Sequence, residues 1–364
     1  MVLKNHGFRL ALVAATALLV ATTISIRPVG VVASERGHFN DPGNLLITDQ
    51  FNNRVVEVNP ETRAIVWSFG SGNPSLCNPG PGAIIGTNDA ERLSDGLTLI
   101  AGTGVPGGSS PADSNFACAD NRVIVVNEDG KIVWQYGQAG VTGSGPNELN
   151  VPVFAIQLPN RNIMIVDQSN SRVIEVGRFS KSIVWSYGPT SGPGALNNPN
   201  SAELLPNGHV LIADENNNRV IEITRSGKIV WQYGSGDPNN TTPLKFAAFA
   251  SRLPNGDTLI TDSGHSRIVQ VNEDKEVVFQ YFTNRGHNSA SLPLPTNAVR
   301  TRDGDLVIAD QFNHRAIIVN EDKRVEFQYG KTNVPGNTTG LLDGPYTAFV
   351  IGDYTGQTPP PEDF

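Results

Sequence analysis

The segment LIADENNNRVIEITRSGKIVWQYG, from Leu211 to Gly234, decides the fold because altered copies of it recur along the chain. Clear copies begin at Leu46, Met164, Leu259 and Val307, and a sixth, interrupted copy starts near Leu97. Every copy has an arginine at the same place, and these arginines are Arg54, Arg122, Arg172, Arg219, Arg267 and Arg315. Their spacing is about 48 residues, apart from a first gap that is about 20 residues longer, and such a period is typical of propeller blades.

Each repeat contains four short apolar runs separated by turn residues. In the fourth unit these runs are residues 201–205, 210–213, 219–223 and 228–233. Short β-branched runs bounded by Asn-Gly and Ser-Gly indicate antiparallel hairpins, and no later segment shows a sustained helical period. A four-stranded blade cannot bury both faces alone, so the blades must stack around an axis. We therefore expect an all-β, six-bladed β-propeller of four-stranded antiparallel blades over residues 34–354.

A second repeated feature predicts how the ring closes. An alanine recurs in the innermost strand of each unit, at Ala90, Ala155, Ala202, Ala250, Ala298 and Ala348. The first unit lacks an inner strand of its own, whereas Ala348 follows the last complete unit. We expect residues 346–351 to pair with residues 45–49, which joins the C-terminal strand to the N-terminal blade and removes a free sheet edge.

The ends of the chain and its charge suggest an exported protein. Lys4 and Arg9 precede a short apolar run at residues 10–20, which predicts a signal peptide over residues 1–33, with an uncleaved membrane anchor as the alternative. Residues 355–364 are predicted to be a disordered tail. The net charge of −8 argues against a nucleic-acid partner. We expect a secreted or periplasmic monomer whose membrane contact is limited to an uncleaved N-terminal segment.

The marker arginine belongs to a repeated D-x-x-N-x-R turn. The aspartates are Asp49, Asp167, Asp214, Asp262 and Asp310, and the second unit has Gly102 at this position. We interpret the motif as structural: the carboxylate pairs with the guanidinium, and the intervening Asn (His265 in the fifth unit) adopts a left-handed backbone. A ring of aspartates that binds a cation is the alternative. The aromatic residues that recur in the outer strands, such as Trp67 and Trp134, are expected to pack between blades.

These motifs resemble those of two known groups. The D-x-x-N-N-R-V turns resemble NHL-repeat propellers, and the N-G-x-x-L-I-A-D and G-K-I-V-W-Q-Y-G segments are similar to repeats of arylsulfotransferase-like propeller proteins. The resemblance implies a propeller over nearly all of the mature chain. It leaves the activity open, because related propellers include binding platforms, peptide-amidating lyases, streptogramin lyases and metal-dependent lactonases.

Unusual residues gather at the end of the propeller that carries the links between blades. Cys77 lies in a long link at residues 71–86 and Cys118 in the insert at residues 103–120, and in an exported protein they are expected to form a disulfide. His265, His287 and His314 fall at the same end. One of them could serve as a general base, as histidines do in the lyase and sulfotransferase relatives; the alternative is that these positions merely tolerate histidine.

The inner strands predict a polar channel mouth. The candidate ligand-binding residues there are Asn88, Asp89, Asn200, Asn297 and Tyr346. Other blades have apolar residues at these positions, so we expect a mouth that is polar on one side and apolar on the other. Glu91 and Glu203 lie one step deeper and make a Ca²⁺ site conceivable, with a water-filled channel as the alternative.

The repeats leave few residues for chemistry. We therefore predict a module that binds a protein, peptide or glycan on the loop-rich face, without a cofactor. The alternative is a propeller enzyme (a lyase, a hydrolase or lactonase, or an arylsulfotransferase-like enzyme) with its site at the channel mouth.

Overall fold

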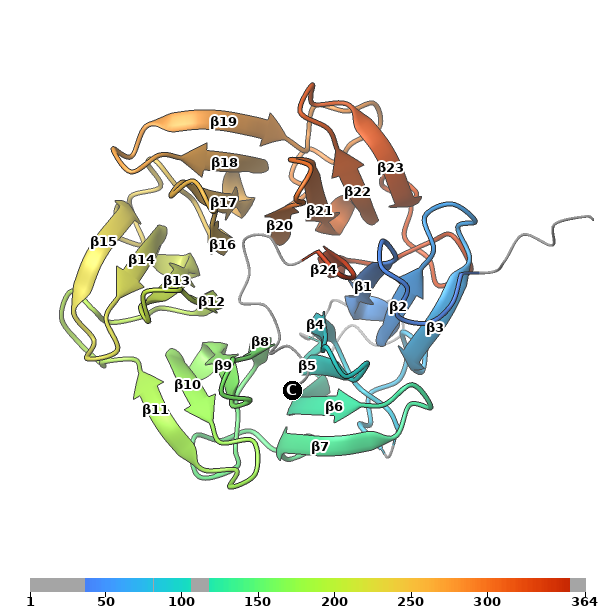
Figure 1. The fold of residues 1–364 in the computed structure, drawn as a ribbon, viewed down its shortest axis with the longest axis horizontal. Coiled ribbons are helices and arrows are strands. Elements are labelled where there is room, and N and C mark those ends of the chain that lie inside the picture. Colours follow the sequence, from blue (N-terminus) through green and yellow to red (C-terminus); the bar gives the residue numbers. More distant parts are fainter. Residues whose placement is uncertain (1–36, 81, 106–117, 354–364) are drawn as a thin grey trace, which may run out of the picture. The chain divides into compact units, whose positions relative to one another are not determined.

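The computed structural model describes residues 37–353 except residue 81 and residues 106–117. The predicted signal peptide and C-terminal tail lie outside these described residues. Within them, no helix has the length and hydrophobicity needed to cross a membrane. The described residues form six four-stranded antiparallel sheets arranged as blades around one axis (Figure 1), which confirms the predicted all-β, six-bladed propeller.

The first three blades each have four strands that follow one another from the axis outward. Blade 1 consists of β24 (Pro345–Val350), β1 (Leu45–Asp49), β2 (Arg54–Val58) and β3 (Ile65–Gly70). Blade 2 consists of β4 (Thr87–Arg92), β5 (Thr98–Val105), β6 (Cys118–Val126) and β7 (Ile132–Gly137). Blade 3 consists of β8 (Pro152–Gln157), β9 (Ile163–Asp167), β10 (Arg172–Val176) and β11 (Ile183–Tyr187).

The other three blades follow the same plan. Blade 4 consists of β12 (Pro199–Leu204), β13 (Val210–Asp214), β14 (Arg219–Ile223) and β15 (Ile229–Gly234). Blade 5 consists of β16 (Ala247–Arg252), β17 (Thr258–Asp262), β18 (Arg267–Val271) and β19 (Val277–Phe282). Blade 6 consists of β20 (Asn297–Arg300), β21 (Leu306–Asp310), β22 (Arg315–Val319) and β23 (Val325–Gly330).

The ring closes as the repeats predict. Strand β24 pairs antiparallel with β1, and Ala348 faces Ile47 in the register. The last strand of the chain thus supplies the inner strand of the first blade, and β1 keeps a hydrogen-bonded neighbour on both edges. This arrangement protects an apolar strand that would otherwise be a free edge.

The recurring aromatic residues of the outer strands pack between blades, as expected. The indole N–H of Trp67 donates to the carbonyl of Glu128 in the next blade at 2.8 Å. Trp134 makes the same bond to Arg178 at 2.7 Å. A buried indole needs such a partner, and in both cases the partner is a turn of the following blade. The repeated tryptophans therefore fasten neighbouring blades to one another.

The D-x-x-N-x-R motif forms a 3-10 turn between the second and third strands of five blades. These turns are η1 (Gln50–Asn52), η2 (Gln168–Asn170), η3 (Glu215–Asn217), η4 (Ser263–His265) and η5 (Gln311–Asn313). In η1 the Asp49 carboxylate accepts hydrogen bonds from Arg54 Nε at 2.7 Å and from Asn52 Nδ2 at 2.8 Å. The predicted ion pair is confirmed, and it recurs in the other four turns.

The predicted backbone role of the asparagine is wrong. The left-handed residue is the next one along, Asn53 with φ 53° in η1, whereas Asn52 ends the 3-10 turn. The side chain of Asn52 is what the turn needs, because it donates to Asp49. His265 does the same in η4, where its Nδ1 lies 2.9 Å from Asp262 Oδ2.

In blade 2, which has no aspartate at the motif position, a different carboxylate pairs with the marker arginine. Gly102 takes the aspartate position, and Asp120 instead accepts from Arg122 Nε at 2.6 Å. The other Asp120 oxygen accepts from the backbone N–H of Ile85 at 2.7 Å. A Cβ on Gly102 would lie 2.8 Å from Ile84 and 2.9 Å from Asp120, so glycine makes room for the displaced carboxylate.

Candidate functional site

The two ends of the propeller contain different kinds of loops. One end holds the turns η1–η5 and the links that lead from each outer strand to the next inner strand; we call it the link face. The other end, which we call the turn end, holds the short turns within the blades. All predicted site residues belong to the link face or to the inner strands that begin there, so this end is the candidate site.

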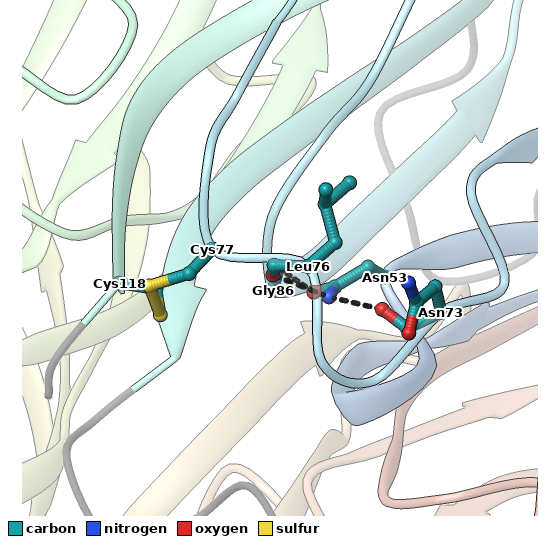
Figure 2. The surroundings of a disulfide bond; sticks show 6 residues. All are labelled: Asn53, Asn73, Leu76, Cys77, Gly86 and Cys118. Atoms are coloured by element: carbon teal, nitrogen blue, oxygen red, sulfur yellow. Dashed lines mark hydrogen bonds between the residues drawn. A yellow bond between two sulfur atoms is a disulfide. The ribbon is translucent and has the colours of Figure 1, made fainter. Parts of the chain in front are cut away.

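A disulfide joins the link at residues 71–86 to the start of β6 on the link face (Figure 2). Cys77 and Cys118 are bonded, with their Cα atoms 5.1 Å apart, as predicted. The link that bears Cys77 is also held by Asn53, whose Nδ2 donates to the carbonyls of Asn73 at 3.0 Å and Leu76 at 3.1 Å. Asn53 Oδ1 accepts from the Gly86 N–H at 2.8 Å. One left-handed turn residue of blade 1 therefore positions both ends of this link.

Apolar packing also attaches the link at residues 71–86 and the start of β6 to the ring. A separate hydrophobic cluster joins Phe51 of η1 to Ile85, Val105 and Cys118, and Leu76 and Phe312 pack against it. Its members come from blades 1, 2 and 6 and from the Cys77 link. Together with the disulfide, this cluster attaches the Cys77 link and the start of β6 to blades 1 and 6.

Residues of opposite blades meet at the mouth of the axis. Tyr346 lies on β24 of blade 1, and Asn200 lies on β12 of blade 4, on the other side of the ring (Figure 1). Asn200 Nδ2 donates to Tyr346 Oη at 2.8 Å and to Glu215 Oε2 at 3.0 Å. Gln168 of blade 3 donates to the same Glu215 oxygen at 3.2 Å. Two of the five predicted mouth residues thus form a polar network that spans the axis.

This network contains groups whose acidity is strongly altered. Burial raises the pKa of Glu215 to about 7, and the hydrogen bond from Asn200 only partly offsets that rise. Burial also raises the pKa of Tyr346, and the nearby Glu215 charge adds to the increase. A carboxyl group that titrates near neutral pH is the property expected of a general base, so the mouth could support proton transfer.

Two of the other predicted mouth residues accept hydrogen bonds from backbone N–H groups on the inner strand of a neighbouring blade. Asp89 Oδ2 accepts from the N–H of Ala155 at 3.0 Å, and Asn297 Oδ1 accepts from the N–H of Ala348 at 3.3 Å. The inner strands have no partner strand on the axis side, so their N–H groups need side-chain acceptors. Asn88 is buried beside them, and its Oδ1 has no partner among the described residues.

The two glutamates considered as metal ligands also cap strand edges. Glu91 Oε2 accepts from the Gln157 N–H at 2.8 Å, and Glu203 Oε2 accepts from the Arg252 N–H at 2.9 Å. Burial raises the pKa of Glu203 to about 8 and that of Glu91 well above its usual range. Within the described residues, no three His, Cys, Asp or Glu side chains form a group able to hold a metal ion. Calcium at the mouth stays a prediction.

Polar and apolar inner strands do not divide the mouth into two sides. Phe154 of blade 3 and Phe249 of blade 5 are the apolar counterparts of Asp89, and polar blade 4 stands between them. Their rings nevertheless meet edge to face, with centroids 5.6 Å apart. Both rings are buried in the largest hydrophobic cluster, so these two apolar positions pack against each other.

The three candidate histidines are not brought together. His265 is bound to Asp262 inside its turn. His314 is the left-handed residue after η5, and its Nδ1 lies 3.2 Å from the Gly344 amide and 3.3 Å from Asp343 Oδ1. His287 is exposed in the link between blades 5 and 6. Two of the three histidines thus fill structural positions, and Glu215, which sequence reasoning missed, lies closer to the mouth residues.

Comparison with known proteins agrees with the fold. No curated protein sequence matches the chain. A protein of unknown function from Bacteroides caccae has a similar structure, with a TM-score of 0.56 and 16% identity over 83% of this chain and 98% of its own. Virginiamycin B lyase from Staphylococcus aureus is similar with a TM-score of 0.52 and 15% identity, over 81% of this chain and 82% of its own. At these identities the likeness shows the fold alone.

A sequence-family model matches most of the repeats. Its description is "Outer membrane protein assembly factor BamB", and it matches residues 51–273 and, in a second overlapping alignment, residues 119–332. These alignments cover the marker arginines of all six blades. The motifs resemble those of NHL-repeat and arylsulfotransferase-like proteins, but the family model that matches is that of BamB. The chain therefore belongs to the BamB assembly-factor family.

Proposed function

We propose that this protein is an extracytoplasmic binding module that holds a protein or peptide partner on its link face. The observation that carries the proposal is that most of the side chains predicted there for catalysis, ligand binding or metal binding make hydrogen bonds within the protein. His265 and His314 are tied into turns, and Asp89, Glu91 and Glu203 cap backbone N–H groups. Phe154 and Phe249 are buried and in contact near the inner strands, which favours binding on the face over binding at their rings.

The exposed surface supports the same proposal. Three links present large apolar side chains to solvent, namely Val141 at 40%, Phe246 at 39% and Leu292 at 51% exposure. Beside the disulfide, the described part of the link face also has a cavity of 250 Å³ lined by Val105 and Val151 among others. Exposed apolar side chains gathered at a loop-rich end are compatible with a protein-interaction surface. The family's description as an assembly factor is consistent with a protein partner.

The disulfide supports the proposed location. A bond between two cysteines that are 41 residues apart persists in oxidising compartments and is rare in the cytosol. Export to the periplasm or to the cell exterior is therefore part of the proposal.

Site-specific photocrosslinking in the native host tests this function. A photoreactive amino acid at Leu292 or Phe246 should yield the same protein adduct. The matched control is Asp274, an exposed residue in a turn of blade 5 at the opposite end, which should yield none. An adduct from Asp274 alone, or no protein adduct from either link position, would contradict the proposal.

A propeller enzyme is the second candidate, and the Glu215 network favours it. A carboxyl group with a pKa of about 7 lies at the mouth and shares Asn200 with Tyr346. Virginiamycin B is a first substrate to try, because a structurally similar protein is a lyase of that compound. Turnover that disappears in Glu215→Gln would support this candidate, whereas turnover that survives in this variant would exclude Glu215 as the base.

A further inference from the structure

The blade junctions at the turn end share an arginine that stacks on an aromatic ring. In each junction of the described ring, the guanidinium carbon lies 4.1–5.4 Å from the ring of the preceding blade's outer strand. The pairs are Arg92–Trp67, Arg178–Trp134, Arg225–Trp185, Arg252–Trp231, Arg300–Phe279 and Arg63–Phe327. Such stacking stabilises the cation but does not satisfy its hydrogen-bond donors.

Most of these arginines also donate to a polar residue on the third strand of the preceding blade. That residue always pairs with the stacked aromatic residue in the strand register. It is Glu57 for Arg92 at 2.8 Å, Glu222 for Arg252 at 2.9 Å, Gln270 for Arg300 at 3.0 Å, and Glu175 for Arg225. A carboxylate or amide oxygen is thus the usual partner of the junction arginine.

The junction between blades 2 and 3 lacks this partner. Val125 faces Trp134 in the register, in the place of the glutamate, and it is fully buried. The Arg178 guanidinium makes no hydrogen bond among the described residues and its Nη1 is buried, whereas Arg225, whose Nη1 is likewise unpaired, still donates to Glu175. Leaving a guanidinium donor buried without an acceptor is costly. Blade 6 also has an apolar residue at this position, Ile318, but its arginine Arg63 is exposed to water.

A cavity opens at this junction beside Arg178 and Trp134. Its volume is 330 Å³, within the lower range of small-ligand pockets. Arg178, Arg161 and Gln157 supply its donors, and Trp134 and Phe179 line it with aromatic surface. Asp95 contributes the one carboxylate of the described lining; it is exposed, and its Oδ1 accepts from the Leu97 N–H. The lining is therefore net positive on a protein whose overall charge is −8.

We propose that this cavity binds a small organic carboxylate. The carboxylate of the ligand accepts from Arg178 in the place that glutamate occupies at other junctions. The apolar body of the ligand packs against Phe179 and Val133, which are 89% and 47% exposed. A planar carboxylate suits the guanidinium fork, and the aromatic wall favours an unsaturated or aromatic body.

Calorimetric titration of the full chain with phenylacetate tests the site. Phenylacetate should bind, whereas neutral phenylacetamide and inorganic phosphate should bind at least about ten-fold more weakly, because a charge-assisted hydrogen bond is lost or the aromatic contact is missing. Arg178→Gln should weaken phenylacetate binding by about ten-fold or more. Val125→Glu should abolish binding, because it supplies the internal carboxylate that other blades have.

Arg225→Gln is the matched control, because the Arg225 guanidinium already donates a hydrogen bond to Glu175 at that junction. This variant should bind phenylacetate like the wild type. Circular dichroism establishes that each variant is folded. If Val125→Glu does not fold, phenylacetate binding by Arg178→Gln alone tests whether Arg178 holds the ligand. Failure of the folded wild type to bind phenylacetate at millimolar concentration, equal binding of phenylacetamide or phosphate, or unchanged binding in Arg178→Gln would overturn the proposal.

Discussion

Tyr346 and Asn200 are hydrogen-bonded across the propeller axis, with Asn200 Nδ2 donating to Tyr346 Oη at 2.8 Å. The two residues are 146 positions apart in the chain and belong to opposite blades. Tyr346 lies on the strand that closes the ring, so this bond ties the closing strand to the far side of the molecule. It also places a hydroxyl over the mouth, next to Glu215.

Removing the Tyr346 hydroxyl should destabilise the fold modestly. Tyr346→Phe leaves Asn200 bonded to Glu215 but breaks the link across the axis, at a cost of about 1 kcal/mol in the free energy of unfolding. Urea denaturation measures this change. Tyr233→Phe is the control, because the Tyr233 hydroxyl makes no hydrogen bond within the described residues, and it should change stability by under about 0.5 kcal/mol. Equal effects of the two substitutions would argue against a stabilising bond.

Stability should decrease as pH rises above the usual carboxyl range. Burial raises the pKa of Asp89 from 3.8 to about 7, so the folded state holds this proton more tightly than the unfolded state. The free energy of unfolding should therefore fall between about pH 4 and about pH 7 and level off above that, with Asp89 contributing up to about 4 kcal/mol.

Asp89→Asn separates this effect from the hydrogen bond. An amide oxygen can still accept from the Ala155 N–H, as the Asn297 oxygen of blade 6 does from the Ala348 N–H of blade 1. The variant should be more stable than the wild type at about pH 8 and should show a weaker pH dependence. Denaturation at several pH values provides the comparison, and an unchanged pH profile would mean that Asp89 does not titrate as described.

The ion pair between Asp120 and Arg122 in blade 2 should contribute strongly to the stability of the fold. Asp120→Ala leaves Arg122 buried without its carboxylate and removes the acceptor of the Ile85 N–H, which should cost about 3 kcal/mol. Asp322 pairs with Arg324 at the same sequence spacing, but both side chains are more than 70% exposed. Asp322→Ala should therefore change stability by less than about 1 kcal/mol. Thermal unfolding of both variants tests the contrast, which fails if they melt together.

The disulfide should stabilise the link face. Cys77 and Cys118 enclose a loop of 41 residues, for which the entropy lost by the unfolded chain corresponds to about 4 kcal/mol. Adding a reductant should lower the melting temperature of the wild type. A Cys77→Ser/Cys118→Ser variant should start from the lower value and show no response to reductant; a response would indicate that the reductant acts elsewhere.

Periodicity in the sequence was enough to predict the ring, its closure and the Asp–Arg pairs, because each depends on a repeat or on a repeat that is missing. Asp120 could also have been found, since it precedes Arg122 in the one unit without the motif aspartate. The Tyr346–Asn200 bond and the meeting of Phe154 with Phe249 could not. They join blades that are not neighbours, and only the diameter of the packed ring decides whether their side chains touch.

The partner-binding role of the link face is the central claim, and photocrosslinking from Leu292 in the wild type and in Glu215→Gln tests it most directly. If the face is a binding surface and partner binding does not depend on Glu215, both proteins should give the same protein adduct in equal yield, and Asp274 should give none. An adduct that is absent from the wild type, or that appears only from Asp274, would contradict the account.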